Sequence, residues 1–321
     1  MLTKRTVTIA NHRGEMLHGV LSIPDQDVSN KRLLIFFQVG IGTKTGVGDY
    51  LRIVADRLSS AGLTVLRLDQ SGTGDSQGEL PDGISIPELF RQVQSGYFKE
   101  DSLAVIDWAA REFSGYQIYL LGECGGCISL TLAGAERMDL IDGVLMMAFP
   151  VLYSPQENTG KTPVREFDAR VTMQGYLRKL MSPRSYARLL SGKSDWGLML
   201  QSARVLMARL INDALKKCGF LRTGGHPDHE RFNWEVFSAF QKLVKNGKPI
   251  LFLLPQLDNE TQEFDAELRD KVLLKSDIYA KYCRYAYLPE TDHSIMFQYS
   301  RDLLCREILD WFNTLENSSH V

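Results

Sequence analysis

The chain has 321 residues, a length that suits one large α/β domain or a domain carrying an insertion. Hydrophobic residues make up 44% and charged residues 24% of it, which excludes a disordered, collagen-like or coiled-coil protein. The net charge of −2 gives no overall positive field, so we expect no nucleic-acid partner. Apolar runs stop far short of the roughly 20 residues that a membrane-spanning helix needs, so we expect no transmembrane segment.

The N-terminus and the cysteines indicate a compartment. Met1–Arg5 leads straight into alternating residues without the apolar stretch of a secretory signal, so we expect a cytoplasmic protein. Five cysteines form an odd number without regular spacing, in a chain long enough to fold without cross-links. We therefore expect thiols rather than disulfides.

The first half of the chain alternates between strand-like and helix-like patterns. Alternating apolar residues over 7–23, interrupted at Asn11–Gly14, predict an antiparallel hairpin. Two apolar runs, 33–37 and 63–68, flank a stretch with helical spacing at 50–61, which predicts a β-α-β unit. The order helix, strand, helix, strand then repeats over 102–113, 117–121, 124–135 and 143–148. These patterns predict a mainly parallel sheet with helices on both faces.

From Pro155 to Lys245 the alternation fails and the sequence is mostly helical, as over Tyr176–Leu190 and Leu198–Leu215. We interpret 155–245 as an inserted helical cap, and 1–154 with 246–321 as the core. In the second core segment the alternation resumes, with strand-like runs and helical runs at 249–254, 261–275, 282–288 and 303–315.

The most informative segment is Tyr119–Ile128, where a buried strand, a Gly-x-Cys-x-Gly turn and a helix follow one another. A nucleophile on a sharp strand-to-helix turn needs small neighbours, and Gly122, Gly125 and Gly126 meet that need. The turn also places the Cys124 thiol at a helix N-terminus, which favours the thiolate. Cys124 is therefore the candidate nucleophile. The alternative is a small buried cysteine, which we also favour for Cys127.

A nucleophile on such a turn needs a histidine and an acid later in the chain. His293 follows the final strand-like run, whereas the other histidines lie in the hairpin, the cap or the tail; His226 of the cap is the one rival. Asp258 follows the run 249–254 and could hold the second imidazole nitrogen of His293. It could equally be an ordinary helix cap.

Glu260 and Asp292 are the substitutes if Asp258 points elsewhere. For the oxyanion hole we expect the amide of Gly125 and one from the loop after the run 33–37, either Val39 or Gly40. The glycines of that loop suggest a phosphate-binding loop as a weaker alternative, because neither dinucleotide nor P-loop spacing is matched.

With these residues the chain resembles the α/β-hydrolase superfamily. The turn Asp69–Ser76 is similar to that superfamily's D-x-x-G-x-G-x-S motif. More narrowly, the elbow cysteine, the cap run Tyr176–Pro183 and the Leu257–Asp258 pair resemble the exosortase A system-associated hydrolases. That family tends to carry Asp-Ala after the elbow cysteine, where this chain has Gly125-Gly126. The resemblance implies an α/β-hydrolase fold with a Cys-His-Asp triad. We expect no cofactor, and no metal either, because His226 and His229 are the one pair of candidate ligands and their short Pro-Asp spacer fits a loop.

Charge is unevenly divided between the two parts of the chain. The segment 155–245 holds 16 Lys and Arg against 8 Asp and Glu, a net charge of +8, so the rest of the chain carries −10. A basic cap could attract an anionic substrate, with Arg178 and Lys179 as candidate contacts, or could merely balance the fold.

Cysteine chemistry favours acyl transfer. Attack on an acyl-thioester exchanges one thioester for another and leaves an activated acyl-enzyme. We therefore expect an acyltransferase or thioesterase whose donor is linked to coenzyme A or an acyl carrier protein. A carboxylester hydrolase is the near alternative. Two other classes are a non-catalytic binding protein of this fold and a Cys124–Cys127 redox protein, although neither explains His293.

Overall fold

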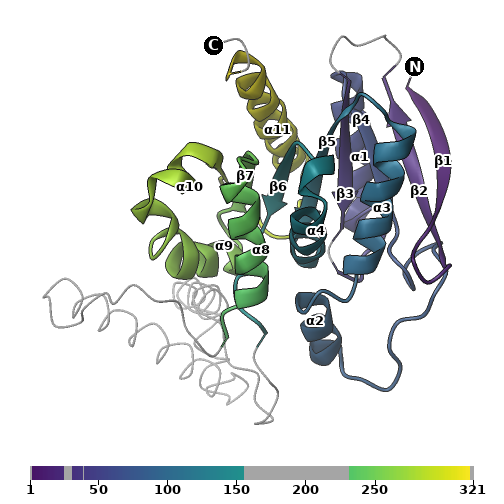
Figure 1. Cartoon of the computed structure of the whole chain (residues 1–321), viewed down its shortest axis with the longest axis horizontal. Helices are drawn as coiled ribbons and strands as arrows, with labels where there is room; N and C mark the ends of the chain where they lie inside the picture. The colour runs from purple at the N-terminus through teal and green to yellow at the C-terminus, as the bar shows by residue number, and fades with distance from the viewer. Residues whose placement is uncertain (1, 25–30, 39, 155–230, 319–321) are drawn as a thin grey trace, which may run out of the picture. The chain divides into compact units, whose positions relative to one another are not determined.

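The computed structural model describes residues 2–24, 31–38, 40–154 and 231–318, which form one eight-stranded sheet flanked by helices (Figure 1). The strands lie in the order β1-β2-β4-β3-β5-β6-β7-β8. The predicted cap helices at 176–190 and 198–215 lie outside the described residues.

The predicted hairpin forms one edge of this sheet. Strands β1 (Thr3–Ala10) and β2 (Met16–Ile23) pair antiparallel, with Ala10 opposite Met16. The turn between them is closed by hydrogen bonds from the Asn11 amide to the Glu15 carbonyl and from the Gly14 amide to the Asn11 carbonyl. β2 then pairs antiparallel with β4, which joins the hairpin to the parallel part.

The other six strands run parallel, which confirms the predicted mainly parallel sheet. They are β3 (Arg32–Phe37), β4 (Thr64–Leu68), β5 (Gln117–Glu123), β6 (Gly143–Met147), β7 (Ile250–Pro255) and β8 (Cys283–Leu288). Strands β3, β4, β6 and β7 are buried along their whole length. Strands covered on both faces need continuous apolar runs, which is the pattern the sequence shows.

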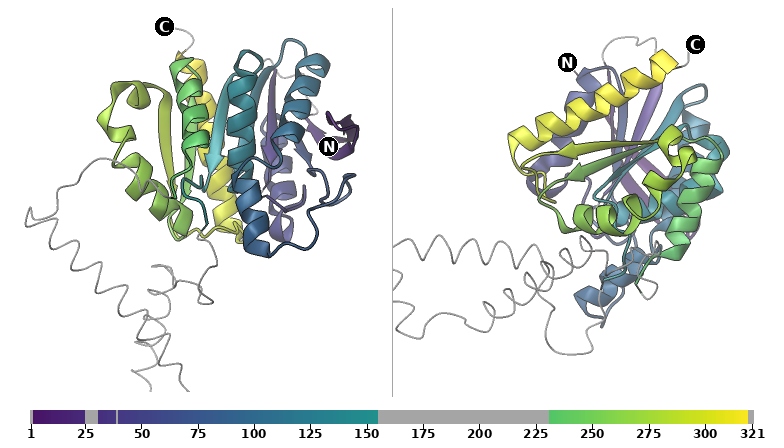
Figure 2. Two further views of the ribbon diagram at one scale, coloured as in Figure 1. Left: turned by 60° about the horizontal axis from the view of Figure 1, so that its bottom comes forward. Right: turned by 90° about the vertical axis from the view of Figure 1, so that its left-hand side faces the viewer.

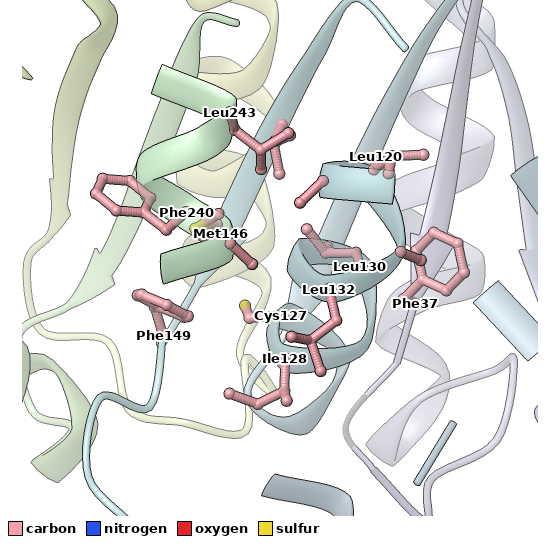
Figure 3. Packing of buried hydrophobic residues seen from close by; sticks show 14 of the residues in the cluster. Phe37, Leu120, Cys127, Ile128, Leu130, Leu132, Met146, Phe149, Phe240 and Leu243 are labelled. Atoms are coloured by element: carbon pink, nitrogen blue, oxygen red, sulfur yellow. The ribbon is translucent and has the colours of Figure 1, made fainter. Parts of the chain in front are cut away.

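Helices cover both faces of the sheet, and each face has its own apolar cluster. α1 (Tyr50–Ser60) and α11 (Gln298–Ser318) pack on one face with Leu34 and Phe36. α3 (Lys99–Glu112), α4 (Gly125–Glu136) and α8 (Trp234–Lys245) pack on the other. Figure 2 shows the sheet between the yellow α11 and the green α8. In Figure 3, Ile128 and Leu130 of α4 lie among side chains of the second face.

The structure adds helices that the sequence patterns do not predict. α2 (Ile86–Gln94) begins at Ser85, whose hydroxyl accepts a hydrogen bond from the Glu88 amide, and α10 is Asp277–Tyr282. Short 3-10 turns lie at 47–49, 138–140 and 273–275.

The helix predicted over 261–275 is confirmed only in its first part. α9 (Asn259–Phe264) gives way to a π-helical turn, Asp265–Arg269. The buried positions Phe264, Leu268 and Leu273 are four and five residues apart, a spacing that a single straight α-helix does not keep on one face.

The boundary of the predicted cap also changes. The chain divides into two compact units, one formed by Met1–Gln156 with Pro227–Val321 and the other by Glu157–His226. α8 packs on α4 and belongs to the first unit, so the core resumes before α8 and not after Lys245. The Asn233 side chain caps α8 by accepting from the Val236 amide, a signal that marks the helix start. Among the described residues, no helix combines the length and apolar character that crossing a bilayer requires.

Close packing of α4 on the sheet predicts that Gly126→Ala is strongly destabilising. A Cβ atom at Gly126 would lie 2.1 Å from the Phe37 carbonyl oxygen, a backbone atom that cannot move without shifting β3. We expect a loss of about 3 kcal/mol or more in the free energy of unfolding, measured by denaturant titration. Gly134→Ala on the same helix is the control, because the nearest atom to its Cβ would be the flexible end of Ile141 at 3.0 Å, and the other neighbours are side-chain atoms at 3.5 Å or more. Equal losses in both variants would contradict this packing argument.

Candidate active site

The candidate nucleophile lies at the junction of β5 and α4. Cys124 has φ 48° and ψ −115°, a backbone conformation that residues other than glycine rarely adopt. Two hydrogen bonds of 2.9 Å hold the turn, from the Cys124 amide to the Met147 carbonyl and from the Cys127 amide to the Cys124 carbonyl. The strained residue is therefore fixed by the neighbouring strand and by its own helix.

Three glycines make this turn possible. A Cβ at Gly122 would lie 2.3 Å from Leu130 Cδ2 and 2.6 Å from the Cys127 nitrogen. A Cβ at Gly125 would lie 2.5 Å from Val93 Cγ1 of α2, and Gly126 abuts β3 as described above. Each position excludes any larger residue, as the sequence pattern predicts.

The loops that follow β7 and β8 bring an acid and a histidine together. His293 Nδ1 lies 2.8 Å from Asp258 Oδ2, in hydrogen-bond contact. The other carboxylate oxygen of Asp258 accepts from the Glu260 amide at 3.3 Å and caps α9, so Asp258 fills both roles considered for it. The two loops are joined by a hydrogen bond of 2.9 Å from the Leu257 amide to the Thr291 carbonyl.

The substitute residues have other positions. Glu260 approaches His293 Nδ1 only to 3.8 Å, with its Oε2 atom. Asp292 accepts hydrogen bonds from the amide and hydroxyl of Ser294. His226, the rival base, lies outside the described residues.

The electrostatics of the histidine are set by its two contacts. Burial opposes a charge on His293, but hydrogen bonds to Asp258 and Cys124 outweigh burial and raise its pKa to about 12. Because Nδ1 faces Asp258, the second ring nitrogen is the one left for the sulfur. Both contacts thus favour the imidazolium that forms when His293 accepts the proton of the thiol.

The pKa of the Cys124 thiol does not shift in the direction that its position at a helix N-terminus predicts. Burial raises the pKa of Cys124, and the hydrogen bond and charge of His293 offset only part of that increase. A buried thiolate loses hydration that one helix terminus does not replace. The pKa of the Cys124 thiol is therefore raised rather than lowered, and His293 is the group whose hydrogen bond and charge favour ionisation.

The oxyanion candidates meet at the same turn. A Cβ at Gly125 would lie 3.1 Å from both the nitrogen and the Cα of Gly40, so the two backbones are in close contact. Gly40 has a positive φ of 32°, and Val93 packs against both glycines. Val39 lies outside the described residues, as do Arg178 and Lys179.

Cys127 has the environment of a packing residue. Its thiol donates to the carbonyls of Gly122 at 3.0 Å and Met147 at 3.3 Å, and Figure 3 shows it within the apolar layer near Phe149. Burial raises its pKa well above the ordinary value. These features argue against a Cys124–Cys127 redox pair.

Two further ligand possibilities are weakened by the geometry. Lys44, the cation of the glycine loop after β3, is bound to Asp69 and Asp75, each at 2.5 Å, which argues against a phosphate-binding role. In the described part of the chain, Asp258, Glu260 and His293 offer ligand atoms within 4.8 Å of one another. The hydrogen bond between His293 Nδ1 and Asp258 Oδ2 already uses the nitrogen that such a metal site would need, which argues against a metal here.

The sequence analysis assigned no role to three residues that lie at the site: Glu123, Tyr50 and Val93. The Ser85-x-x-Glu88 capping signal could have revealed α2 and hence Val93. Glu123 precedes Cys124 directly, and only its burial distinguishes it from a surface glutamate.

Comparisons with known proteins identify the fold. No family profile matches the chain, and no curated protein does. Est1E of Butyrivibrio proteoclasticus, with ferulic acid bound, has a TM-score of 0.54 at 17% identity, covering 96% of this chain and 98% of its own. The Pyrococcus furiosus esterase Pf2001 has a TM-score of 0.54 at 13% identity, covering 98% of this chain and 91% of its own. The dienelactone hydrolase of Anabaena variabilis has 0.53 at 12%, covering 98% of each chain. The chain has the α/β-hydrolase fold; its narrower resemblance to the exosortase-associated hydrolases stays a prediction.

The pKa differences predict an order of alkylation. Iodoacetamide should modify Cys124 before Cys127, Cys283 and Cys305, because these three are buried and their pKa values are raised by burial, to about 12 for Cys283 and about 11 for Cys305. Since the Cys124 pKa is also raised, its rate should increase steadily as pH increases from 7 to 9. Peptide mapping by mass spectrometry measures both. A rate at Cys124 that is independent of pH over this interval would show a preformed thiolate and contradict the assignment.

Proposed function

We propose that this protein is an enzyme that transfers or hydrolyses acyl groups through a thioester at Cys124. The observation that carries the proposal is the 2.8 Å contact between His293 and Asp258, on loops that bring the imidazole into hydrogen-bond contact with Cys124. A non-catalytic binding protein would need neither the strained cysteine nor this contact.

The reaction begins when the Cys124 sulfur attacks the acyl carbonyl and forms a carbon–sulfur bond. As the bond forms, His293 accepts the proton of the Cys124 thiol, and Asp258 stabilises the positive charge that results. The amide of Gly125, with that of Gly40 or Val39, would bind the carbonyl oxygen as it gains negative charge. Collapse of the intermediate breaks the bond to the leaving group, which takes the proton from His293.

The second half releases the acyl group. Water, an amine, an alcohol or a thiol attacks the thioester, His293 accepts the proton of that nucleophile, and the Cys124 sulfur leaves as the thiolate. Because a thioester is nearly as activated as the donor, transfer to an acceptor competes well with hydrolysis. We propose an acyl-thioester donor, linked to coenzyme A or an acyl carrier protein, for this reason.

The segment 157–226, which excludes α8, holds 13 Lys and Arg against 5 Asp and Glu and so keeps a net charge of +8. This charge supports an anionic donor, with Arg178 and Lys179 as proposed contacts.

Hydrolysis of carboxylic esters is the second candidate. It is favoured by two structural neighbours, an esterase and a dienelactone hydrolase, and by the ferulic acid bound to a third. Both candidates use the same acyl-enzyme, and they differ in the donor and in the acceptor.

Variants of the proposed triad test the mechanism. Cys124→Ala should reduce turnover of acyl-thioesters and esters by at least about a thousandfold, because no acyl-enzyme can form. His293→Ala should cost roughly 10²–10⁴-fold, and Asp258→Asn should cost less because a disoriented imidazole still acts. Cys127→Ala is the matched control and should keep most activity. Steady-state kinetics measure these losses, and retained activity in Cys124→Ala would overturn the proposal.

Salt dependence tests the proposed donor. The second-order rate constant with acyl-coenzyme A should fall steeply from 0.01 to 0.1 M salt, since the Debye length shortens from about 30 to about 10 Å, whereas small neutral esters should react at a constant rate. The double variant Arg178→Gln/Lys179→Gln should weaken only the anionic donor.

Lys242→Gln/Lys245→Gln, which removes two exposed charges from α8, is the control. Salt-independent rates with both donor types would favour the ester hydrolase.

A further inference from the structure

Glu123 is a buried acid next to the nucleophile, and the reaction described above does not use it. It is the last residue of β5 and is only 4% exposed. A buried carboxyl group without a compensating partner is costly, so its surroundings indicate what it does.

One partner comes from α1. Tyr50, which is 1% exposed, donates a hydrogen bond from its hydroxyl to Glu123 Oε2. The alternation of side chains along β5 explains why Glu123 contacts Tyr50. Tyr119 and Leu121 face the apolar cluster that contains Tyr50, and Glu123 lies two residues further on the same side of the strand. The carboxyl group is thus held on the α1 side of the sheet, beneath the turn that carries Cys124.

A second polar side chain shares this place. Phe36 of β3 pairs with Leu121 of β5 and Phe37 with Gly122, so Gln38 comes opposite Glu123 as the register continues. Gln38 is buried, and neither of its amide atoms has a hydrogen-bond partner among the described residues. Two buried polar groups, the Tyr50 hydroxyl and the Gln38 amide, therefore come from the elements that neighbour Glu123.

Several titratable groups interact with Glu123. Burial raises its pKa to about 7, while the charge of His293 lowers it and that of Asp258 raises it. The ionised Glu123 in turn raises the pKa of Cys124, and of Cys127 behind it. A negative carboxylate and a negative sulfur on consecutive residues compete for the single positive charge of His293.

We propose that Glu123 is a positioning residue that sets the charge of the Cys124–His293 pair, opposing the thiolate when it is ionised and permitting it when it is protonated. This inference rests on the proposed role of Cys124 as nucleophile. In consequence, the pair would gain nucleophilic strength less steeply with rising pH than a cysteine and histidine alone. The hydrogen bond from Tyr50 stabilises the Glu123 carboxylate, so Glu123 disfavours the Cys124 thiolate down to a lower pH.

The test compares rates of Cys124 alkylation by iodoacetamide from pH 6 to pH 9 in the wild-type protein and in Glu123→Gln. Glutamine keeps the size of the side chain and can still accept from Tyr50. The two rates should agree at pH 6, and the variant should become several-fold to about tenfold faster as pH passes 7, a change that corresponds to about one pH unit in the thiol titration. A purely structural effect would change the rate at every pH.

Two further variants keep the proposal falsifiable. Glu123→Asp retains a carboxylate and should retain the wild-type profile. Tyr50→Phe removes the donor to Glu123, so the carboxyl group should ionise at higher pH and the separation from Glu123→Gln should begin later. Thermal unfolding of each variant identifies any that fails to fold.

Equal alkylation profiles for Glu123→Gln and wild type, or a slower variant above pH 7, would overturn the inference. Because alkylation needs no substrate, it reports on Glu123 independently of turnover. Failure of Cys124→Ala to lose activity would instead overturn the proposed function and leave the alkylation result standing.

Discussion

The turn between β5 and α4 is the constraint on which the site depends. Its glycines let α4 lie directly on the backbone of β3, and this contact forces Cys124 into a positive φ. The same geometry places the sulfur above the carboxyl end of the sheet, where the loops after β7 and β8 deliver Asp258 and His293. A larger residue at Gly126 would move α4 and thereby the nucleophile, so packing and the proposed chemistry are fixed by one feature.

Much of this arrangement follows from local sequence. Continuous apolar runs predicted the parallel strands, and the glycines around Cys124 predicted the turn, because both patterns report constraints between near neighbours. Asp258 and His293 are 35 residues apart, yet each follows a strand, and parallel strands bring their carboxyl ends to one edge. The parallel topology therefore predicts that Asp258 and His293 lie at the same edge of the sheet as Cys124.

What the sequence did not predict depends on burial and on long-range packing. The pKa of Cys124 is raised because neighbouring elements exclude water, and no local pattern reports that. In the sequence nothing distinguishes Glu123 from a surface glutamate, and only the fold brings Tyr50 of α1 into hydrogen-bond contact with it. A π-helical turn and a 3-10 turn follow α9, and Phe264, Leu268 and Leu273 all reach the same apolar cluster, which is a long-range packing effect. α8 was assigned to the cap because the helical content of 155–245 conceals where the core resumes.

The mass of the protein during turnover is the most direct test for an acyl-enzyme at Cys124. The enzyme is mixed with acyl-coenzyme A thioesters of increasing chain length, quenched in acid at short times, and examined by intact and peptide mass spectrometry, with Cys124→Ser included to slow release of the acyl group. The proposed mechanism predicts that the mass of both proteins increases by that of the acyl group, and that the acyl group is located on residue 124. An adduct on another residue, or turnover with residue 124 unmodified at every time in both proteins, would contradict it.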